Sequence, residues 1–291
     1  MRELTAKACA KINIGLRITG VREDGFHELE TIFQSVDLCD KIRVTANFGG
    51  IQITSNDRTV PRGTENTCYR AAHLLQKVAQ SPFPFEEIGC EIHIDKKIPM
   101  GAGLGGGSSD AATTLRLLNR IWNLNFSAEQ LLPFARQIGA DVPFFLRPGA
   151  AIGYGIGDEL EWFRPPWEFT GLIIFPGISI STKWAYRNLN LNLTNAKKYI
   201  KLEPSQVEQL FLHELPLFFK NDFESLVFGE FPELREIQIQ LYRAGAVFAN
   251  LSGSGSALFG LFEDEEKAKA APPLFDSHPY KKFIVRPFFE V

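Results

Sequence analysis

Five glycines occupy the seven positions from 101 to 107, within the segment PMGAGLGGGSSDAA. Ser108, Ser109 and Asp110 follow at once, and these residue types are typical of a helix start. Glycine loses more conformational entropy on ordering than any other residue, so this density needs a physical reason. Bare backbone amides at a helix N-terminus can converge on a phosphate, whose charge the helix dipole favours. The segment therefore predicts a binding site for a phosphate chain.

Other glycine motifs fit this segment less well. Gly101, Gly103 and Gly106 match G-x-G-x-x-G, but the preceding residues alternate polar and apolar, whereas the strand of a dinucleotide fold is apolar on both faces. The chain has no Gly-Lys-Ser/Thr, which excludes a Walker A loop, and no H-R-D or D-F-G of protein kinases. A flexible glycine linker is disfavoured because ordered elements are expected on both sides.

Periodicity predicts the elements that position this loop. Residues 8–18, ACAKINIGLRI, alternate and predict a half-buried strand with Lys11 and Asn13 on its polar face. Asp24-Gly25 is a turn signal, so a hairpin or a strand-loop-strand is expected there. Further strands are expected at 40–46, 49–55, 89–99 and 171–177 and at the end of 250–262, and helices at 65–80, 108–124, 127–139 and 231–245.

The order of these elements predicts an α+β fold, with mixed or antiparallel sheets packed against helices. Strands and helices do not alternate strictly, which argues against a doubly wound parallel sheet. The Pro-rich, aperiodic segment RPPWEFTG at 164–171 is the expected domain boundary. We therefore expect one domain over 1–163 and another over 164–291.

Composition limits the function classes. The chain has 291 residues, 45% of them hydrophobic, and a net charge of −3, which argues against a general nucleic-acid or membrane-surface binder. No apolar run approaches the roughly 20 residues needed to span a bilayer, and the N-terminus lacks the apolar stretch of a signal peptide. The four cysteines are scattered, so free thiols in a reducing cytoplasm are expected.

Three segments together resemble the GHMP small-molecule kinases, which include galactokinase, homoserine kinase and mevalonate kinase. They are AKINIGLRITG near the N-terminus, the glycine loop PMGAGLGGGSSDAA, and NLSGSGSALFG near the C-terminus. Within these kinases, the chain is similar to the branch that phosphorylates a cytidine diphosphate derivative of methylerythritol. The segments that carry this similarity are AKINIGLRITGVREDGFHELETIFQSVDL, GADVPFFL and FPGISISTKWAY. The resemblance spans about residues 6–262.

This resemblance implies a fold and an activity. It implies an N-terminal ATP-binding domain, a C-terminal substrate-binding domain and an active site in the cleft between them. ATP would be held by the glycine loop, and its γ-phosphoryl group would pass to the 2-hydroxyl of the methylerythritol unit, in isoprenoid precursor synthesis. Mg²⁺ is expected on chemical grounds, because the β- and γ-phosphate oxygens need neutralising. Its protein ligands are not evident; Ser108, Ser109 or a hydrated ion held by ATP itself are the alternatives.

The resemblance also assigns the catalytic pair. From the residues alone, Lys11 reads as a solvated strand lysine, and Asp141 reads equally as a cap for a helix opened by Pro143. The resemblance makes Asp141 the general base, or the group that orients the 2-hydroxyl. It makes Lys11 the partner of that carboxylate and a stabiliser of charge on the accepting oxygen.

Recognition of the cytosine base is expected at the hairpin. The resemblance implies that His27 reads the edge of the base, where spacing alone favours an exposed hairpin histidine. Phe26 stands where the family usually has tyrosine, and it would sandwich the base with Tyr186. Asn13 would position the substrate. The remaining calls are ATP contacts from Pro99, Gly101, Gly103, Leu104, Gly105, Gly106, Gly107, Ser108, Ser109 and Asn66, and substrate contacts from Ser181, Thr182, Gly253 and Ser254.

Two other functions stay open. Another kinase of the superfamily, for homoserine or mevalonate, would give the cytosine-binding residues no purpose. A non-catalytic nucleotide-binding protein would not need Lys11 and Asp141. An NAD-dependent dehydrogenase is a remote further alternative. The expected partner is a small-molecule substrate, with no nucleic acid and no membrane, for a cytoplasmic monomer or homodimer.

Overall fold

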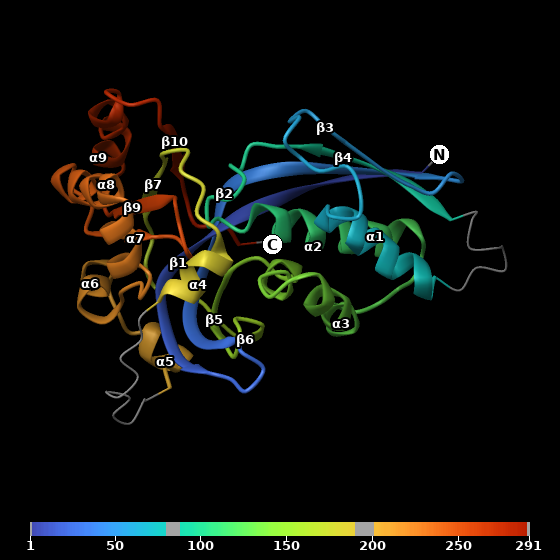
Figure 1. The fold of residues 1–291 in the computed structure, drawn as a ribbon, viewed down its shortest axis with the longest axis horizontal. Helices are drawn as coiled ribbons and strands as arrows, with labels where there is room; N and C mark the ends of the chain where they lie inside the picture. Colours follow the sequence, from blue (N-terminus) through green and yellow to red (C-terminus); the bar gives the residue numbers. More distant parts are fainter. Residues whose placement is uncertain (1, 80–87, 190–200, 290–291) are drawn as a thin grey trace. The chain divides into compact units, whose positions relative to one another are not determined.

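The computed structural model describes residues 2–79, 88–189 and 201–289 (Figure 1). Every predicted site residue lies within these ranges, whereas Gln80, the last residue of the helix expected at 65–80, lies outside them. The chain forms two compact units that interleave along the sequence. The first comprises Met1–Ala10, Leu38–Met100 and Gly105–Pro148, and the second comprises Lys11–Asp37, Gly101–Leu104 and Gly149–Val291. The domain boundary expected near 164 stays a prediction.

Two long paired strands, β1 (Glu3–Val21) and β2 (His27–Asn47), run through both units. The predicted hairpin is confirmed: Gly25 adopts φ 82° in the turn, and the amide of Phe26 donates to the carboxylate of Asp24 at 3.0 Å. The separate strand predicted at 40–46 is wrong, because these residues continue β2 without a break. Local alternation cannot tell one long strand from two short ones.

The expectation that β1 is half-buried is also wrong. All residues from 8 to 16 are buried, so the polar face of the strand is covered as well as the apolar one. Lys11 is 3% exposed and Asn13 is 2% exposed, which excludes a solvated lysine. Alternation shows only that a strand has two different faces; the packing of the rest of the chain decides whether both are covered.

In the first unit, the end of β2 pairs antiparallel with β4 (Gly89–Asp95), and β4 pairs parallel with β3 (Ile51–Ser55). The helices α1 (Thr67–Val78), α2 (Gly106–Ile121) and α3 (Ala128–Ile138) pack on one another, as Figure 1 shows, and α2 and α3 also pack against a short 3-10 helix at Pro143–Leu146. The predicted strand at 89–99 therefore ends early, at Asp95, and leaves 96–105 as a loop that leads into α2.

The ends of these helices follow from local chemistry. α3 begins with a capping box between Ser127 and Gln130 and ends at Gly139, as predicted. α2 begins at Gly106, two residues before the predicted start, because Gly105 takes up the left-handed conformation at φ 70° and acts as the N-cap. The serines therefore lie inside the first turn rather than before it.

In the second unit, the start of β2 pairs antiparallel with β5 (Ala150–Tyr154), which pairs with β6 (Glu159–Phe163). A second sheet has the antiparallel order β10 (Lys281–Val285), β7 (Thr170–Phe175), β9 (Leu258–Phe262) and β8 (Phe248–Leu251). The helices of the second unit are α4 (Thr182–Asn188), α5 (Pro204–Val207), α6 (Leu215–Phe218), α7 (Glu224–Glu230), α8 (Pro232–Arg243) and α9 (Glu265–Ala270). The α+β class with mixed and antiparallel sheets is confirmed.

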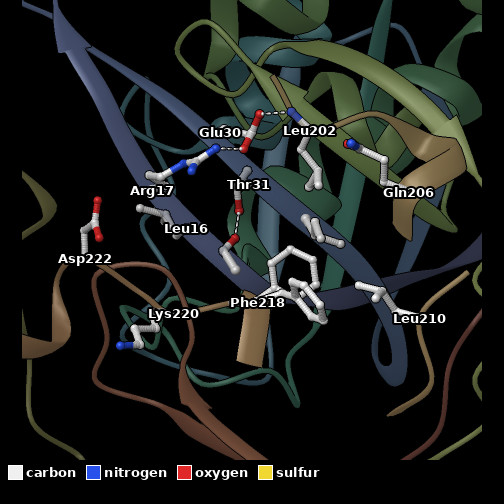
Figure 2. Close-up of a pocket in the computed structure, with 13 residues that line it drawn as sticks. Leu16, Arg17, Glu30, Thr31, Leu202, Gln206, Leu210, Phe218, Lys220 and Asp222 are labelled. Carbon is white, nitrogen blue, oxygen red and sulfur yellow. Dashed lines mark hydrogen bonds and ion pairs between the residues drawn. The ribbon is translucent and has the colours of Figure 1, made fainter. Parts of the chain in front are cut away.

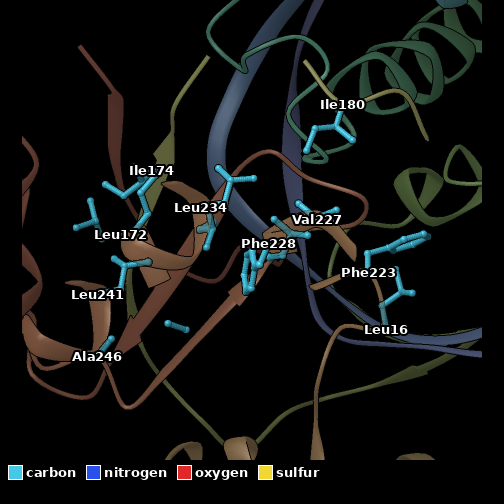
Figure 3. Packing of buried hydrophobic residues seen from close by; sticks show 14 of the residues in the cluster. Leu16, Leu172, Ile174, Ile180, Phe223, Val227, Phe228, Leu234, Leu241 and Ala246 are labelled. Carbon is cyan, nitrogen blue, oxygen red and sulfur yellow. The ribbon is translucent and has the colours of Figure 1, made fainter. Parts of the chain in front are cut away.

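The core of the second unit lies between this sheet and its helices. Figure 3 shows Leu172 and Ile174 of β7 close to Leu234 and Leu241 of α8. Leu16 of β1 belongs to the same buried cluster. Leu16 and Ile18 therefore anchor the later part of β1 in this core, and the same strand carries Lys11 and Asn13.

The cysteines correct one sequence expectation. Cys9 and Cys39 form a disulfide between β1 and β2, so the prediction of four free thiols is wrong for this pair. Their separation of 30 residues gave no signal, because only strand pairing brings them together. Cys68 and Cys90 are free and buried, and burial raises the pKa of the Cys90 thiol to about 12, so it is not a reactive thiolate. No helix among the described residues is long and apolar enough to cross a membrane.

Candidate active site

Lys11 is the centre of a buried polar cluster in the second unit. Its ammonium group donates to the side-chain oxygen of Asn13 at 2.5 Å and to the carbonyl oxygen of Gly103 at 3.0 Å. The ring of Phe33 lies 5.4 Å from the ammonium nitrogen. Lys11 and Asn13 share one face because they are two residues apart on a strand. The structure thus brings the N-terminal motif that contains Lys11 and Asn13 into contact with Gly103 of the glycine loop.

A hydrogen-bonded chain orients Asn13. Its side-chain nitrogen donates to the hydroxyl of Thr31 at 2.8 Å, and this hydroxyl donates to the carbonyl oxygen of Gly15 at 2.6 Å. The Asn13 oxygen is thereby directed at Lys11. Sequence reasoning missed Thr31, because its role depends on the pairing of β1 with β2, which no local pattern reveals.

The loop between β8 and β9 reaches the same cluster. A Cβ on Gly253 would lie 3.5 Å from both the Lys11 ammonium and the Asn13 oxygen, and Gly253 has φ 57°. The hydroxyl of Ser252 donates to the carbonyl oxygen of Gly103 at 2.9 Å. The missed residue Asn221 holds this loop, since its amide donates to the carbonyl oxygens of Leu251 and Gly253, each at 2.8 Å.

The glycines of the loop have separate physical causes. Gly101, Gly103 and Gly105 have positive φ values of 66°, 78° and 70°, which L-residues rarely adopt. Gly103 also meets a neighbour, because its Cβ would lie 2.0 Å from the carbonyl oxygen of Ser252. Gly107 has neither constraint: it is helical, and its Cβ would be in ordinary contact, 3.5 Å from the hydroxyl of Thr67. Nothing in the described protein requires glycine at 107.

The start of α2 offers free amides in the first unit. The first intrahelical bond runs from the amide of Ser109 to Gly105 at 2.9 Å, so the preceding amides of Gly106, Gly107 and Ser108 come before the helical ladder. Gly107 is exposed and Ser108 is half-buried, whereas Ser109 is 2% exposed. Ser108 is therefore better placed than Ser109 to offer its hydroxyl to a ligand. Of the loop's other predicted contacts, Pro99 and Leu104 are buried.

Asn66 lies beside this helix start. It is the N-cap of α1: its oxygen accepts from the amide of Cys68 at 2.8 Å, and its nitrogen donates to Pro61 at 2.6 Å. Thr67, the next residue, donates to the carbonyl oxygen of Gly107 at 2.7 Å. Both ends of the Asn66 amide thus have a structural role, and its contact with adenine stays a prediction.

Asp141 lies in the first unit, half-buried, in the turn between α3 and the 3-10 helix. The capping interpretation is wrong, because Val142 is the N-cap residue and no side chain caps that helix. Asp141 thus lies three residues beyond the end of α3 and two before the 3-10 helix. Its pairing with Lys11 stays a prediction.

The predicted base-binding residues lie in the second unit. The rings of His27 and Tyr186 lie 4.9 Å apart at 35°, and Tyr186 packs edge-on against Phe223. Phe26 is 60% exposed. His27 is thus half-buried against an aromatic ring rather than an isolated exposed histidine. An exposed ring at Phe26 is available for stacking, and the sandwich with Tyr186 stays a prediction.

Thr182 and Ser254 are brought together from segments 72 residues apart, with their hydroxyls 3.1 Å from each other. Ser181 instead caps α4, since its hydroxyl accepts from the amide of Trp184 at 3.4 Å. Of the predicted substrate residues, Asn13, Gly253, Ser254 and Thr182 therefore form one connected group around Lys11 in the second unit.

A cavity of about 510 Å³ lies beside β1 and β2 in the second unit (Figure 2). Figure 2 shows Glu30 at its wall between Arg17 and Leu202; the carboxylate accepts from them at 2.7 and 2.8 Å. None of the predicted site residues lines this cavity, but Thr31 does. Through Thr31 the cavity is one hydrogen bond from Asn13.

Comparison with known proteins identifies the class. The model of the GHMP kinases N terminal domain matches residues 66–149, and that of the GHMP kinases C terminal matches residues 205–272. A crystal structure of homoserine kinase from Cytophaga hutchinsonii superposes with a TM-score of 0.74 over 99% of this chain and 95% of that chain at 21% identity, which shows the fold alone. The fold and the glycine loop are those of a GHMP kinase.

Two more similar proteins narrow this class. A protein of Chlorobium luteolum named 4-diphosphocytidyl-2-C-methyl-D-erythritol kinase is 43% identical over 93% of each chain. A crystal structure of 4-(cytidine 5'-diphospho)-2C-methyl-D-erythritol kinase has a TM-score of 0.76 and 32% identity, covering 98% of this chain and all of that one. The chain belongs to the 4-diphosphocytidyl-2-C-methyl-D-erythritol kinase family.

Proposed function

We propose that this chain transfers the γ-phosphoryl group of ATP to the 2-hydroxyl of 4-diphosphocytidyl-2-C-methyl-D-erythritol, giving the 2-phosphate and ADP. The reaction belongs to the non-mevalonate route to isoprenoid precursors. The observation that carries the proposal is the buried cluster of Lys11 and Asn13 with Gly103 and Gly253, in which all three family motifs meet. Family membership supplies the substrate.

The proposed chemistry is positioning and charge stabilisation, as in other phosphoryl transfers. The 2-hydroxyl oxygen attacks the γ-phosphorus, the bond to the β–γ bridging oxygen breaks, and ADP leaves. Asp141 takes up the hydroxyl proton or orients the hydroxyl group. Lys11, whose position Asn13 and Gly103 fix, stabilises negative charge on the reacting oxygens. Because this ammonium is buried, its effect is stronger than in water.

ATP would lie at the start of α2. The amides of Gly106, Gly107 and Ser108 point away from the helical ladder and can hold phosphate oxygens. Among the described residues, no three His, Cys, Asp or Glu side chains form a metal cluster. Such a cluster is not needed for Mg²⁺, which is usually held by substrate phosphates and one or two protein oxygens. The Ser108 hydroxyl suits that role, and the bound ion would neutralise the phosphate oxygens.

The cytidine end of the substrate would lie near the hairpin. His27 would read the edge of the base, and Phe26 with Tyr186 would supply aromatic faces. The loss of a tyrosine hydroxyl at Phe26 leaves stacking intact. Ser181, Thr182 and Ser254 would line the path towards Lys11, and the Thr182–Ser254 contact supports their shared location. A cytoplasmic location and a monomeric or homodimeric state remain predictions.

A coupled assay of ADP release tests this function directly. The enzyme would receive ATP, Mg²⁺ and, separately, the cytidyl substrate, homoserine and mevalonate, with CMP as a competitor. We expect turnover of the cytidyl substrate alone, and inhibition by CMP. Turnover of another alcohol would show that the proposed substrate is wrong and that the chain is still a kinase. Binding of ATP without any turnover would favour a non-catalytic protein.

A further inference from the structure

A buried triad of charged residues lies behind the start of α2. The ammonium group of Lys96 lies 2.5 Å from the carboxylate of Asp40 and 2.8 Å from that of Asp110. The three side chains are 5%, 0% and 4% exposed. The triad is outside the cluster around Lys11, and none of its members has a role in the proposed reaction.

The triad joins three elements of the first unit. Asp40 lies on β2, Lys96 directly follows β4, and Asp110 lies in the second turn of α2. The second oxygen of Asp40 accepts from the amides of Lys97 at 2.6 Å and Ile98 at 2.9 Å. The loop that leads into the glycines is therefore fixed both by its backbone and through the Lys96 ammonium.

The Lys96 ammonium also lies close to Gly106, the first residue of α2. A Cβ on Gly106 would lie 3.2 Å from the Lys96 ammonium and 3.0 Å from the side chain of Ile98. A Cβ at these distances would require Lys96 or Ile98 to move by a few tenths of an ångström, which favours glycine at 106, where φ is not positive. The ammonium group of Lys96 and the side chain of Ile98 therefore lie against the first residue of α2.

The charges of the triad exclude a simpler role. Two carboxylates surround one ammonium, so Lys96 brings no net positive charge to a bound phosphate. Burial, opposed by the nearby Lys96 ammonium and aided by Asp40, raises the pKa of Asp110 to about 8. The other titratable group that faces Asp110 is the thiol of Cys68 on α1, whose own pKa burial raises. Because the triad carries no net positive charge, it cannot attract a phosphate electrostatically. Its effect on a bound phosphate would come from holding the neighbouring backbone in position.

We propose that Lys96, held by Asp40 and Asp110, is a positioning residue for nucleotide binding: it fixes the first turn of α2 so that its amides meet the phosphate chain. The inference rests on the proposed use of this helix start as the phosphate site. It accounts for the absence of lysine from the glycine loop, since the lysine lies beneath the loop's last glycines and aligns backbone donors instead of contacting phosphate.

The test compares Lys96→Met with Lys97→Met, the same change at the adjacent exposed lysine. Calorimetry measures the Kd for a non-hydrolysable ATP analogue, and steady-state kinetics give the KM for the alcohol. We expect Lys96→Met to raise the Kd for the analogue by about tenfold or more, because small displacements of positioned hydrogen-bond donors weaken binding strongly. The KM for the alcohol should be unchanged. Lys97→Met should match the wild type. A purely structural role would lower the melting temperature and affect both substrates alike.

A second variant covers the case in which Lys96→Met fails to fold. Lys96→Met/Asp110→Asn replaces the ammonium and one carboxyl group of the triad by neutral groups, and Asp40 keeps its two amide donors. Unchanged analogue affinity in a folded Lys96→Met or in the double variant would overturn the inference. If the wild-type protein binds the analogue but does not turn over the alcohol, the proposed function alone is overturned. The comparison of analogue affinities between variants needs no alcohol and still tests the role of Lys96.

Discussion

The ammonium group of Lys11 donates to the side-chain oxygen of Asn13 at 2.5 Å, two positions along one buried strand. We expect Lys11→Met to lower kcat by roughly a thousandfold, because a preorganised cation at developing charge is lost. The Kd for an ATP analogue should change by less than about threefold, since the proposed phosphate site is the start of α2 and not the cluster around Lys11. Kinetics and calorimetry check both values, and Lys41→Met, exposed on β2, is the matched control. Normal turnover in Lys11→Met would remove its catalytic role.

Asp141 is expected to act on the alcohol rather than on the nucleotide. Asp141→Ala should leave the affinity for ATP nearly intact while turnover falls by about two to four orders of magnitude, the range for loss of a general base. Glu129→Gln, which removes an exposed carboxylate from α3, should behave as the wild type. If the two variants turn over equally well, Asp141 has no part in the transfer.

Gly107 is the glycine of the loop that the described protein does not require. Gly107→Ala should fold with an unchanged or slightly higher melting temperature, because alanine is the better helix former by about 0.5–1 kcal/mol. The KM for ATP should nevertheless rise about tenfold, since the new methyl group occupies the approach of the phosphate. Gly229→Ala, in the open helix α7, is the control: it should have the same small effect on the melting temperature and leave the KM for ATP unchanged. An unaltered KM in Gly107→Ala would place the phosphates elsewhere.

Thr31 controls the direction of the Asn13 amide. Thr31→Val removes the hydroxyl that accepts from the buried side-chain N–H of Asn13 and donates to the carbonyl oxygen of Gly15. Each group left without a partner costs about 1–3 kcal/mol of stability. We expect a lower melting temperature and a KM for the alcohol about three to ten times higher, with ATP affinity unchanged. Thr45→Val, which breaks only an exposed bond to Glu3, provides the comparison. Equal effects on both substrates would contradict the assignment.

Glu224 makes stability depend on pH. Burial raises its pKa from 4.5 to about 7, against the lowering effect of hydrogen bonds from Leu251 and Gln238. Its contribution is therefore complete below pH 4.5, where both states bind the proton, and is lost as the pH rises to about 7. Glu224→Gln should have a higher melting temperature than the wild type at pH 8, by a few degrees, with the gain vanishing towards pH 4.5.

Thermal unfolding between pH 4.5 and 8 measures this difference. Glu230→Gln, an exposed carboxylate at the end of the same helix, should show no such pH-dependent gain. A constant difference between Glu224→Gln and the wild type at every pH would show that the buried carboxylate is not the titrating group.

The local features of the fold could be predicted from the sequence. Glycines before a helix, strand alternation around Lys11, and a turn at Asp24-Gly25 are set by neighbouring residues, since backbone conformation and side-chain period are local properties. These patterns predicted the helices α1, α2, α3 and α8, the hairpin and the α+β class, but not the shorter helices α4 to α7 and α9 or the strands β5, β6 and β10. Three motifs in the right order were enough to indicate the kinase family.

The burial of each element and the contacts between distant groups depend instead on tertiary packing. Local alternation made Lys11 a solvated residue, whereas packing on both faces of β1 buries it. Gly103 and Ser252 are 149 residues apart, and Lys96 and Asp40 are 56 apart, yet each pair is in hydrogen-bond contact. Such contacts depend on how strands pair and helices pack, and a pattern that repeats every two or four residues carries no information about partners so far along the chain.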